Sequence, residues 1–231
     1  MNKEFEKNLN KLRVDLIASN KLENKKISPV LSWLNKRQKF DKTNIIKTGL
    51  DKLKDWNFNN NGELNHKTGQ FFSVIGLKIK NAYNREARNW DQPILNQKHG
   101  GILAILTRKR GKVIEFLLYA RREPGDHNLK LCPSFSATQS NLNLAHGGKK
   151  TKLSNLIFSK KRKLICETIH YEEGARFYQK PNKNTLIQIN KKDEKYIRDP
   201  NFIWLNLSQI KKLNLKKGII NPYVKTILFM I

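Results

Sequence analysis

Apolar residues recur at three- and four-residue steps over the first fifty or so residues, which is the spacing of one helical face. The second of these runs begins with Ser28, which can cap a helix, and Pro29, which suits the first helical position. The pattern therefore predicts a helical segment over residues 1–55. Its three apolar stripes are Phe5, Leu9, Leu12 and Leu16; Val30, Trp33 and Leu34; and Ile46, Leu50 and Leu53.

After Trp56 the pattern changes to short runs rich in Val, Ile and Phe, which is typical of strands. "GILAILTRK" and "VIEFLLYARR", joined through "RGK", predict a hairpin of two largely buried strands. Helical patterns return in "NLSQIKKLNL" and in "PYVKTILFMI", and a short helix is expected in "GGKKTKLSNLIF". The order predicts an α+β fold with a mostly antiparallel sheet, in one module over residues 56–231. Further strands are expected in "GQFFSVIGLKIK", "KLICETIHY" and "NTLIQIN".

The chain of 231 residues carries a formal net charge of +27, which favours an anionic partner. The excess is mostly Lys, spread along the chain together with many Asn and Ile residues, as codon bias in an AT-rich genome would produce. We therefore do not expect nucleic acid to be the partner.

Cys132 and Cys166 form no CxxC pair, which argues against a zinc knuckle and a disulfide framework. The N-terminus lacks an apolar signal-peptide core and no run reaches membrane-spanning length, so we expect a cytoplasmic protein that does not bind a membrane.

The stretch from Arg122 to Asn141 has little helical or strand period and is rich in polar residues. Long, polar, patternless loops inside compact domains are usually functional or disordered, and we interpret this one as functional. Glu123 precedes Pro124 and Gly125 at a strand end, where an apolar surround would let a carboxyl group act as base or acid. The hydroxyl and amide groups of the following residues could line a polar ligand site, or they could brace a solvent-facing loop. These residues include Thr138, Ser140 and Asn141.

Four other segments place polar residues at the ends of apolar runs, where binding groups are usually presented. For each one a structural role is an alternative: a packing histidine, loop-bracing amides, a simple turn or a structural salt bridge. In the fourth segment, two adjacent carboxylates beside a guanidinium could separate acid and base roles at neutral pH. The segments are His66 with Thr68; Gln92 and Gln97; His146 beside Gly147 and Gly148; and Glu172 and Glu173 with Arg176.

Seven short motifs, in order from His66 to about Asn221, resemble those of the NDP-hexose 2,3-dehydratase family. They are "H-x-x-G-x-FFSV-x-G", "W-x-QPIL-x-Q-x-x-GGIL", "EPG", "P-x-x-x-AT-x-SN", "H-x-G", "EEG-x-RF" and "WLNLSQI…N". The resemblance covers more than two thirds of the chain. It departs from the family pattern in length, since this chain holds one set of motifs and about half the usual number of residues.

The resemblance implies a Nudix-like fold and removal of water across carbons 2 and 3 of a nucleotide-linked 4-keto-6-deoxyhexose, such as the dTDP sugar. The 4-ketone acidifies the carbon 3 proton, so that a carboxylate or histidine base suffices, and no cofactor and no metal are expected. A homodimer would replace the family's tandem modules, and a ketoreductase could capture the product. The residues expected to be catalytic are Glu123, Glu173, His66 and His146. Those expected to bind substrate are Gln92, Gln97, Thr138, Ser140, Asn141, Glu172, Arg176 and Asn184.

Two alternatives remain open. An inactive homologue would bind the nucleotide sugar without turning it over. A basic RNA-binding protein would instead use the net charge and the "SKKRK" run at Ser159 to Lys163. The dehydratase hypothesis requires the polar strand-end segments to gather around a single pocket.

Overall fold

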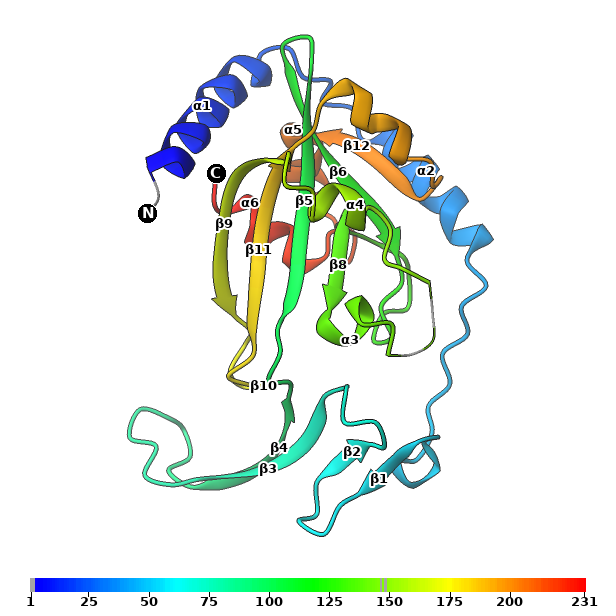
Figure 1. The fold of residues 1–231 in the computed structure, drawn as a ribbon, viewed down its shortest axis with the longest axis vertical. Coiled ribbons are helices and arrows are strands. Elements are labelled where there is room, and N and C mark those ends of the chain that lie inside the picture. The colour runs from blue at the N-terminus through cyan, green and yellow to red at the C-terminus, as the bar shows by residue number, and fades with distance from the viewer. Residues whose placement is uncertain (1–2, 146, 148) are drawn as a thin grey trace.

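The computed structural model describes residues 3–145, 147 and 149–231, and it contains two β-sheets with helices around the larger one (Figure 1). Within these residues no helix is long and apolar enough to cross a membrane. The α+β class expected from the sequence is confirmed, and most strand pairs are antiparallel. Two pairs, β5 with β11 and β4 with β10, are parallel.

The main sheet follows the order β12-β6-β5-β11-β9, with β7 added against β6 and β8 against β5. The predicted hairpin is present as β5 and β6, and the two later apolar runs form β9 and β11. The bounds are β5 Gly101–Arg110, β6 Val113–Arg121, β7 Lys130–Pro133, β8 Phe135–Thr138, β9 Lys163–Tyr171, β11 Pro181–Gln188 and β12 Phe202–Asn206.

The smaller sheet, in the order β1-β2-β3-β4-β10, lies beyond one end of the main sheet (Figure 1). The chain passes from β4 into β5 at Gly100, where an added Cβ would collide with the backbone carbonyl oxygen of Pro181. Only glycine therefore allows the chain at this point to lie so close to Pro181, the first residue of β11. The bounds are β1 Trp56–Phe58, β2 Leu64–His66, β3 Ser73–Ile79, β4 Trp90–Asn96 and β10 Phe177–Tyr178.

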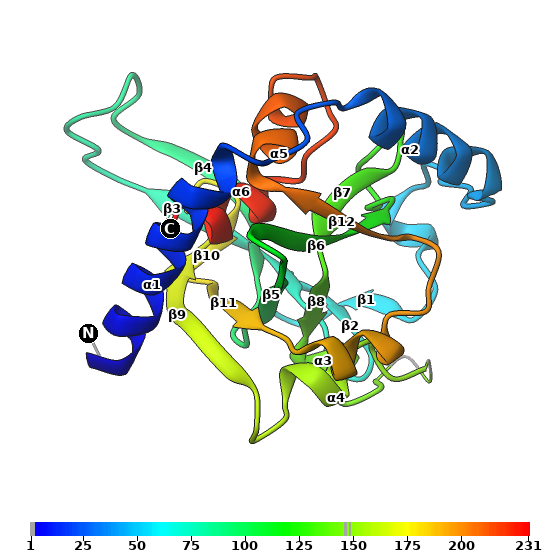
Figure 2. The ribbon, with the colours of Figure 1, turned by 90° about the horizontal axis from the view of Figure 1, so that it is seen from above.

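Helices cover both faces of the main sheet (Figure 2). The first two predicted apolar stripes are confirmed as buried, because Leu9, Leu12, Leu16, Val30 and Leu34 join the core on one face. That core also includes the last two helices, and a second core on the other face includes the short helix α4. The bounds are α1 Lys3–Asn20, α2 Ser28–Phe40, α3 Gln139–Leu142, α4 Ser154–Ile157, α5 Leu207–Asn214, α6 Pro222–Leu228, and the 3-10 turns η1 Leu50–Lys52 and η2 Lys191–Tyr196.

Two expectations about local structure are wrong. The third predicted helix is only the turn η1, and its stripe residues Ile46 and Leu50 are exposed, because this segment has no sheet face on which to bury them. The stretch after Arg122 is patternless only in its first half. Its second half forms β7, β8 and α3, which are inserted into the main sheet.

Candidate functional site

The main sheet splits at the end that faces the smaller sheet. Strands β5 and β6 pair with each other only from Thr107 to Arg110 and from Val113 to Phe116. Beyond that point β8 pairs with β5 and β7 pairs with β6. The ends of β6, β8 and β9 and the start of β11 therefore meet at one end of the sheet, and this end carries several of the polar residues singled out from the sequence (Figure 1).

Glu172, one residue after β9, lies at the centre of a buried polar group. We call this group the Glu172 cluster, and its members are Glu172, Lys180, Asn182 and Tyr223. The Glu172 Oε1 accepts hydrogen bonds of 2.5 Å from the Tyr223 hydroxyl and 2.5 Å from the Asn182 amide. Lys180 Nζ lies 3.4 Å from the same oxygen, and the side chains of Glu172 and Lys180 are only 11% and 9% exposed. Three donors therefore converge on one carboxylate oxygen.

Arg121 and Glu123, at the end of β6, form an ion pair that we call the Arg121 pair; each side chain is about one third exposed, at 34% and 33%. The buried thiol of Cys132 lies 4.0 Å from Glu123 Oε1. Burial raises the pKa of Cys132 to about 12, so this thiol stays protonated and is not a nucleophile.

Charges from both the cluster and the pair act on Tyr223. Its pKa is raised first by burial, then by the hydrogen bond to Glu172 and by the charges of Glu172 and Glu123, while Arg121 opposes the rise. The phenol therefore remains a proton donor across the physiological pH range. A neutral phenol, a buried ammonium group and two carboxylates can together stabilise an oxyanion and move a proton.

Asn182 and Asn184 lie on β11 near the same end. The Asn182 Oδ1 accepts a bond of 2.8 Å from the Gly101 backbone N–H, so this side chain ties β5 to the Glu172 cluster. The Asn184 Oδ1 is buried and finds no partner among the residues that the structure describes. An unpaired buried acceptor is unusual and is a candidate contact for a polar ligand.

The smaller sheet holds two of the candidates. His66, at the end of β2, packs edge-on against Trp56 and Phe71 with ring centroids 5.4 and 4.6 Å away, and its Nδ1 lies 2.9 Å from the Thr68 hydroxyl. These contacts favour a packing role. They do not join His66 to the Glu172 cluster.

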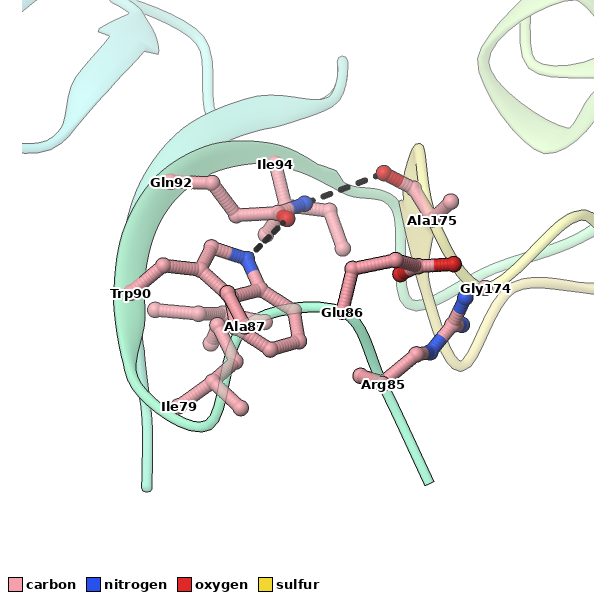
Figure 3. Close-up of a pocket in the computed structure, with 10 residues that line it drawn as sticks. Ile79, Arg85, Glu86, Ala87, Trp90, Gln92, Ile94, Gly174 and Ala175 are labelled. Atoms are coloured by element: carbon pink, nitrogen blue, oxygen red, sulfur yellow. Dashed lines mark hydrogen bonds between the residues drawn. The ribbon is translucent and has the colours of Figure 1, made fainter. Parts of the chain in front are cut away.

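Gln92 lines a cavity of about 340 Å³ on the smaller sheet (Figure 3). Its amide oxygen accepts a bond of 2.8 Å from the Trp90 indole, and its amide nitrogen donates one of 3.0 Å to the Ala175 carbonyl. Both ends of the amide are thus used to brace β4 against the loop before β10. The floor of the cavity is mostly apolar, with Leu77, Ile79, Trp90 and Ile94.

The remaining candidates do not belong to the Glu172 cluster or lie outside the described residues. Glu173 and Arg176 pair at 3.5 Å with side chains 68% and 76% exposed, so they face solvent. Gln97 is half-buried just past β4. His146 lies outside the described residues. The hydroxyl groups of Thr138 and Ser140 lie 2.8 Å apart, and Thr138 caps α3 by accepting from the Asn141 N–H.

The sequence assigns no site role to Tyr223 or Asn182, and it places Lys180 only near the Glu172–Glu173 segment. The run "PYVKTILFMI" predicts a helix, and Asn221 and Pro222 signal where that helix begins. Nothing in the local pattern indicates that the Tyr223 hydroxyl reaches a carboxylate 51 positions earlier. Within the described ranges, no group of three or more His, Cys, Asp or Glu residues could hold a metal ion.

Comparisons with known proteins add a family match. A model of the family described as NDP-hexose 2,3-dehydratase matches residues 27–231. The dTDP-4-dehydro-6-deoxy-alpha-D-glucopyranose 2,3-dehydratase of Saccharopolyspora spinosa is 33% identical over 199 residues, which cover 85% of this chain and 40% of that protein. The enzyme of the same name from Amycolatopsis orientalis is 31% identical over 206 residues, 86% of this chain and 43% of its own length. The chain thus spans about two fifths of the length of these relatives.

Among solved structures, the chain is similar to an Ap4A hydrolase of C. elegans, with a TM-score of 0.37 and 16% identity, over 58% of this chain and 96% of the hydrolase. A similarity with such a low TM-score does not establish a shared fold or function. The Nudix-like core therefore stays a prediction.

Proposed function

Because this chain belongs to the NDP-hexose 2,3-dehydratase family, we propose that it removes water from a nucleotide-linked 4-keto-6-deoxyhexose. The observation that carries the proposal is the gathering of two carboxylates and a protonated phenol at one end of the main sheet. This supply of groups matches what the elimination needs: a base, an oxyanion donor and a proton for the departing hydroxyl.

Glu123 is the proposed base. Arg121 forms an ion pair with it, and Arg121 also lines two cavities. Its carboxylate takes the proton from carbon 3, and the electrons of that C–H bond move toward the 4-keto oxygen. The Lys180 ammonium group donates a hydrogen bond to the developing oxyanion, and the Tyr223 hydroxyl donates a second one when its proton turns away from Glu172.

The bond between carbon 2 and its hydroxyl then breaks as the electrons return from the enolate. The departing hydroxyl takes the proton held by Glu123 and leaves as water, so no additional acid is consumed. Glu172 positions the Tyr223 phenol and the Lys180 ammonium group. The enol product tautomerises to a 3,4-diketosugar, which a ketoreductase would capture.

The test is an incubation of the full chain with dTDP-4-keto-6-deoxyglucose, a ketoreductase and NADPH. We expect NADPH oxidation that depends on the chain, together with a reduced deoxysugar in the mass spectrum. Thermal stabilisation by dTDP without turnover would instead indicate the inactive binding homologue. Binding to RNA that falls steeply with salt, without any effect of dTDP, would favour the basic RNA-binding alternative.

A homodimer is part of the proposal. Its support is the exposed aromatic surface of the smaller sheet and the loop after β3, where Phe58, Phe72 and Tyr83 are 61%, 37% and 89% exposed. Light scattering on the pure chain should give twice the mass of 27.0 kDa. A monomer at micromolar concentration, with full turnover, would remove this part.

A further inference from the structure

A second cavity, of about 590 Å³, lies where the C-terminal end of α2 meets the end of β6 and the start of β12. We call it the α2 cavity. From α2 and the residues after it come Arg37, Phe40, Asp41, Lys42 and Thr43; from β6 and beyond come Tyr119 to Arg122, Leu129, Pro200 and Asn201. Its volume falls within the range of small-molecule sites.

The lining of the α2 cavity is strongly basic. Arg37, Lys42, Arg121 and Arg122 contribute four cations, against the single carboxylate of Asp41. That carboxylate is already engaged, because it accepts 2.7 Å from Arg122 Nε and 2.6 Å from the Thr43 hydroxyl. Since Arg122 is paired with Asp41 and Arg121 with Glu123, the surplus positive charge of the cavity comes from Arg37 and Lys42.

Two of its guanidinium groups are incompletely paired. The Nε atoms of Arg37 and Arg121 are buried and find no hydrogen-bond partner among the residues that the structure describes. A buried donor without a partner is destabilising. An oxyanion offers several acceptors in the fork geometry that guanidinium groups match, so Arg37 and Arg121 suit an anionic ligand in this cavity.

From this basic lining we infer that the α2 cavity binds the diphosphate of a nucleoside diphosphate ligand. The inference rests on the proposed function for the identity of the ligand. Arg121 connects the two sites, since its guanidinium lines the α2 cavity while its Nη2 pairs with Glu123. A diphosphate held there would place the attached sugar beside the Arg121 pair.

The experiment is titration calorimetry of the full chain with inorganic pyrophosphate and, separately, with dTDP. The test variant is Arg37→Gln, which removes a cavity cation that has no part in the proposed chemistry. We expect both ligands to bind the native chain and to bind Arg37→Gln about 10- to 100-fold more weakly, the loss of one charge-assisted bond. The matched control Lys39→Gln, an exposed cation two positions along the same helix, should leave both affinities unchanged.

Arg37→Lys adds a second comparison, since it keeps the charge and removes the planar fork. It should lose part of the affinity, and the thermal midpoints of all variants should match that of the native chain. Equal binding by native chain and Arg37→Gln, equal weakening in Lys39→Gln, or absence of pyrophosphate binding would each overturn the site. Pyrophosphate binding without dTDP binding would overturn the nucleotide as its ligand.

Turnover separates this inference from the proposed function. If both hold, Arg37→Gln raises KM for the nucleotide ketosugar about 10- to 100-fold and leaves kcat within about threefold, because the bond is present in ground and transition states alike. Binding of dTDP that depends on Arg37 in a chain without dehydratase activity would support the site and reject the proposed function. An active Arg37→Gln chain with an unchanged KM would support the proposed function and reject the site.

Discussion

At the end of the main sheet, polar side chains from separate strands and from α6 hold one another in buried positions, with Glu172 and Lys180 about nine tenths covered. In the smaller sheet, the polar candidates have structural contacts. His66 packs between the rings of Trp56 and Phe71, and both ends of the Gln92 amide are hydrogen-bonded within the protein. Both regions carry motif residues of the same family, but only the first combines burial, opposite charges and a proton donor.

The difference shows that a shared motif residue does not by itself define a shared role. An amide or imidazole whose hydrogen-bonding groups are already used by the protein has little left to offer a ligand. A carboxylate with one oxygen engaged by its own protein partners keeps the other for chemistry. The following substitutions test this division, from the largest expected effect to the smallest.

Glu123→Gln should reduce kcat about 10²- to 10⁴-fold, since the amide cannot take the carbon 3 proton. His66→Phe, its counterpart in the smaller sheet, keeps an aromatic ring beside Trp56 and Phe71 and should keep turnover within about threefold. Glu173→Gln, at an exposed carboxylate, should also leave turnover nearly unchanged. The measurement is coupled NADPH oxidation. A large loss in His66→Phe or Glu173→Gln would return that residue to the catalytic role expected from the sequence.

Gly100→Ala, at the passage between the two sheets, should destabilise the fold by more than about 2 kcal/mol, because the new methyl group meets backbone and not a flexible side chain. Gly76→Ala in β3 is the matched control, as nothing lies within 4 Å of its added Cβ. Urea unfolding of both variants measures the difference. Equal stability would mean that Gly100 does not approach the Pro181 carbonyl oxygen as closely as the structure shows.

Asn182→Ala should lower the free energy of unfolding by about 1–3 kcal/mol, since it leaves the Gly101 N–H without its acceptor and removes one donor from Glu172. Gln92→Ala in the smaller sheet also removes two hydrogen bonds, but at a site open to solvent, and should cost about 1 kcal/mol or less. The same urea titrations serve both. A larger loss for Gln92→Ala would reverse the ranking of the two regions.

Raising the pH tests the burial of Tyr223. Its raised pKa means that the folded protein keeps the phenolic proton after the unfolded chain has released it, above about pH 10. The unfolded state then binds fewer protons, so stability falls as the pH rises, by up to about 1.4 kcal/mol per pH unit.

Tyr223→Phe removes this contribution, so its stability relative to the native chain should improve as the pH rises from about 9 to about 11. Tyr83→Phe, at an exposed position beside the smaller sheet, should show no such trend. Denaturant midpoints at each pH give the comparison. Parallel curves for the native chain and Tyr223→Phe would place the phenol in water.

The sequence predicted the strands of the main sheet and most helices, because elements that bury one or both faces place apolar residues at regular intervals along the chain. It failed for residues 43–56, where an apolar stripe has no surface to pack against, and for the stretch that becomes β7 and β8. Those short strands are fixed by pairing with β6 and β5, not by their own pattern.

By itself, the sequence determined the fold class, the order of the elements and the family, since these depend on local periodicity and on ordered motifs. Only the tertiary structure decided which of two adjacent carboxylates is buried, and that Tyr223, Lys180 and Asn182 surround Glu172. The physical reason is that hydrogen bonding and desolvation depend on what lies nearby in space. Strand pairing brings together residues that no pattern along the chain connects.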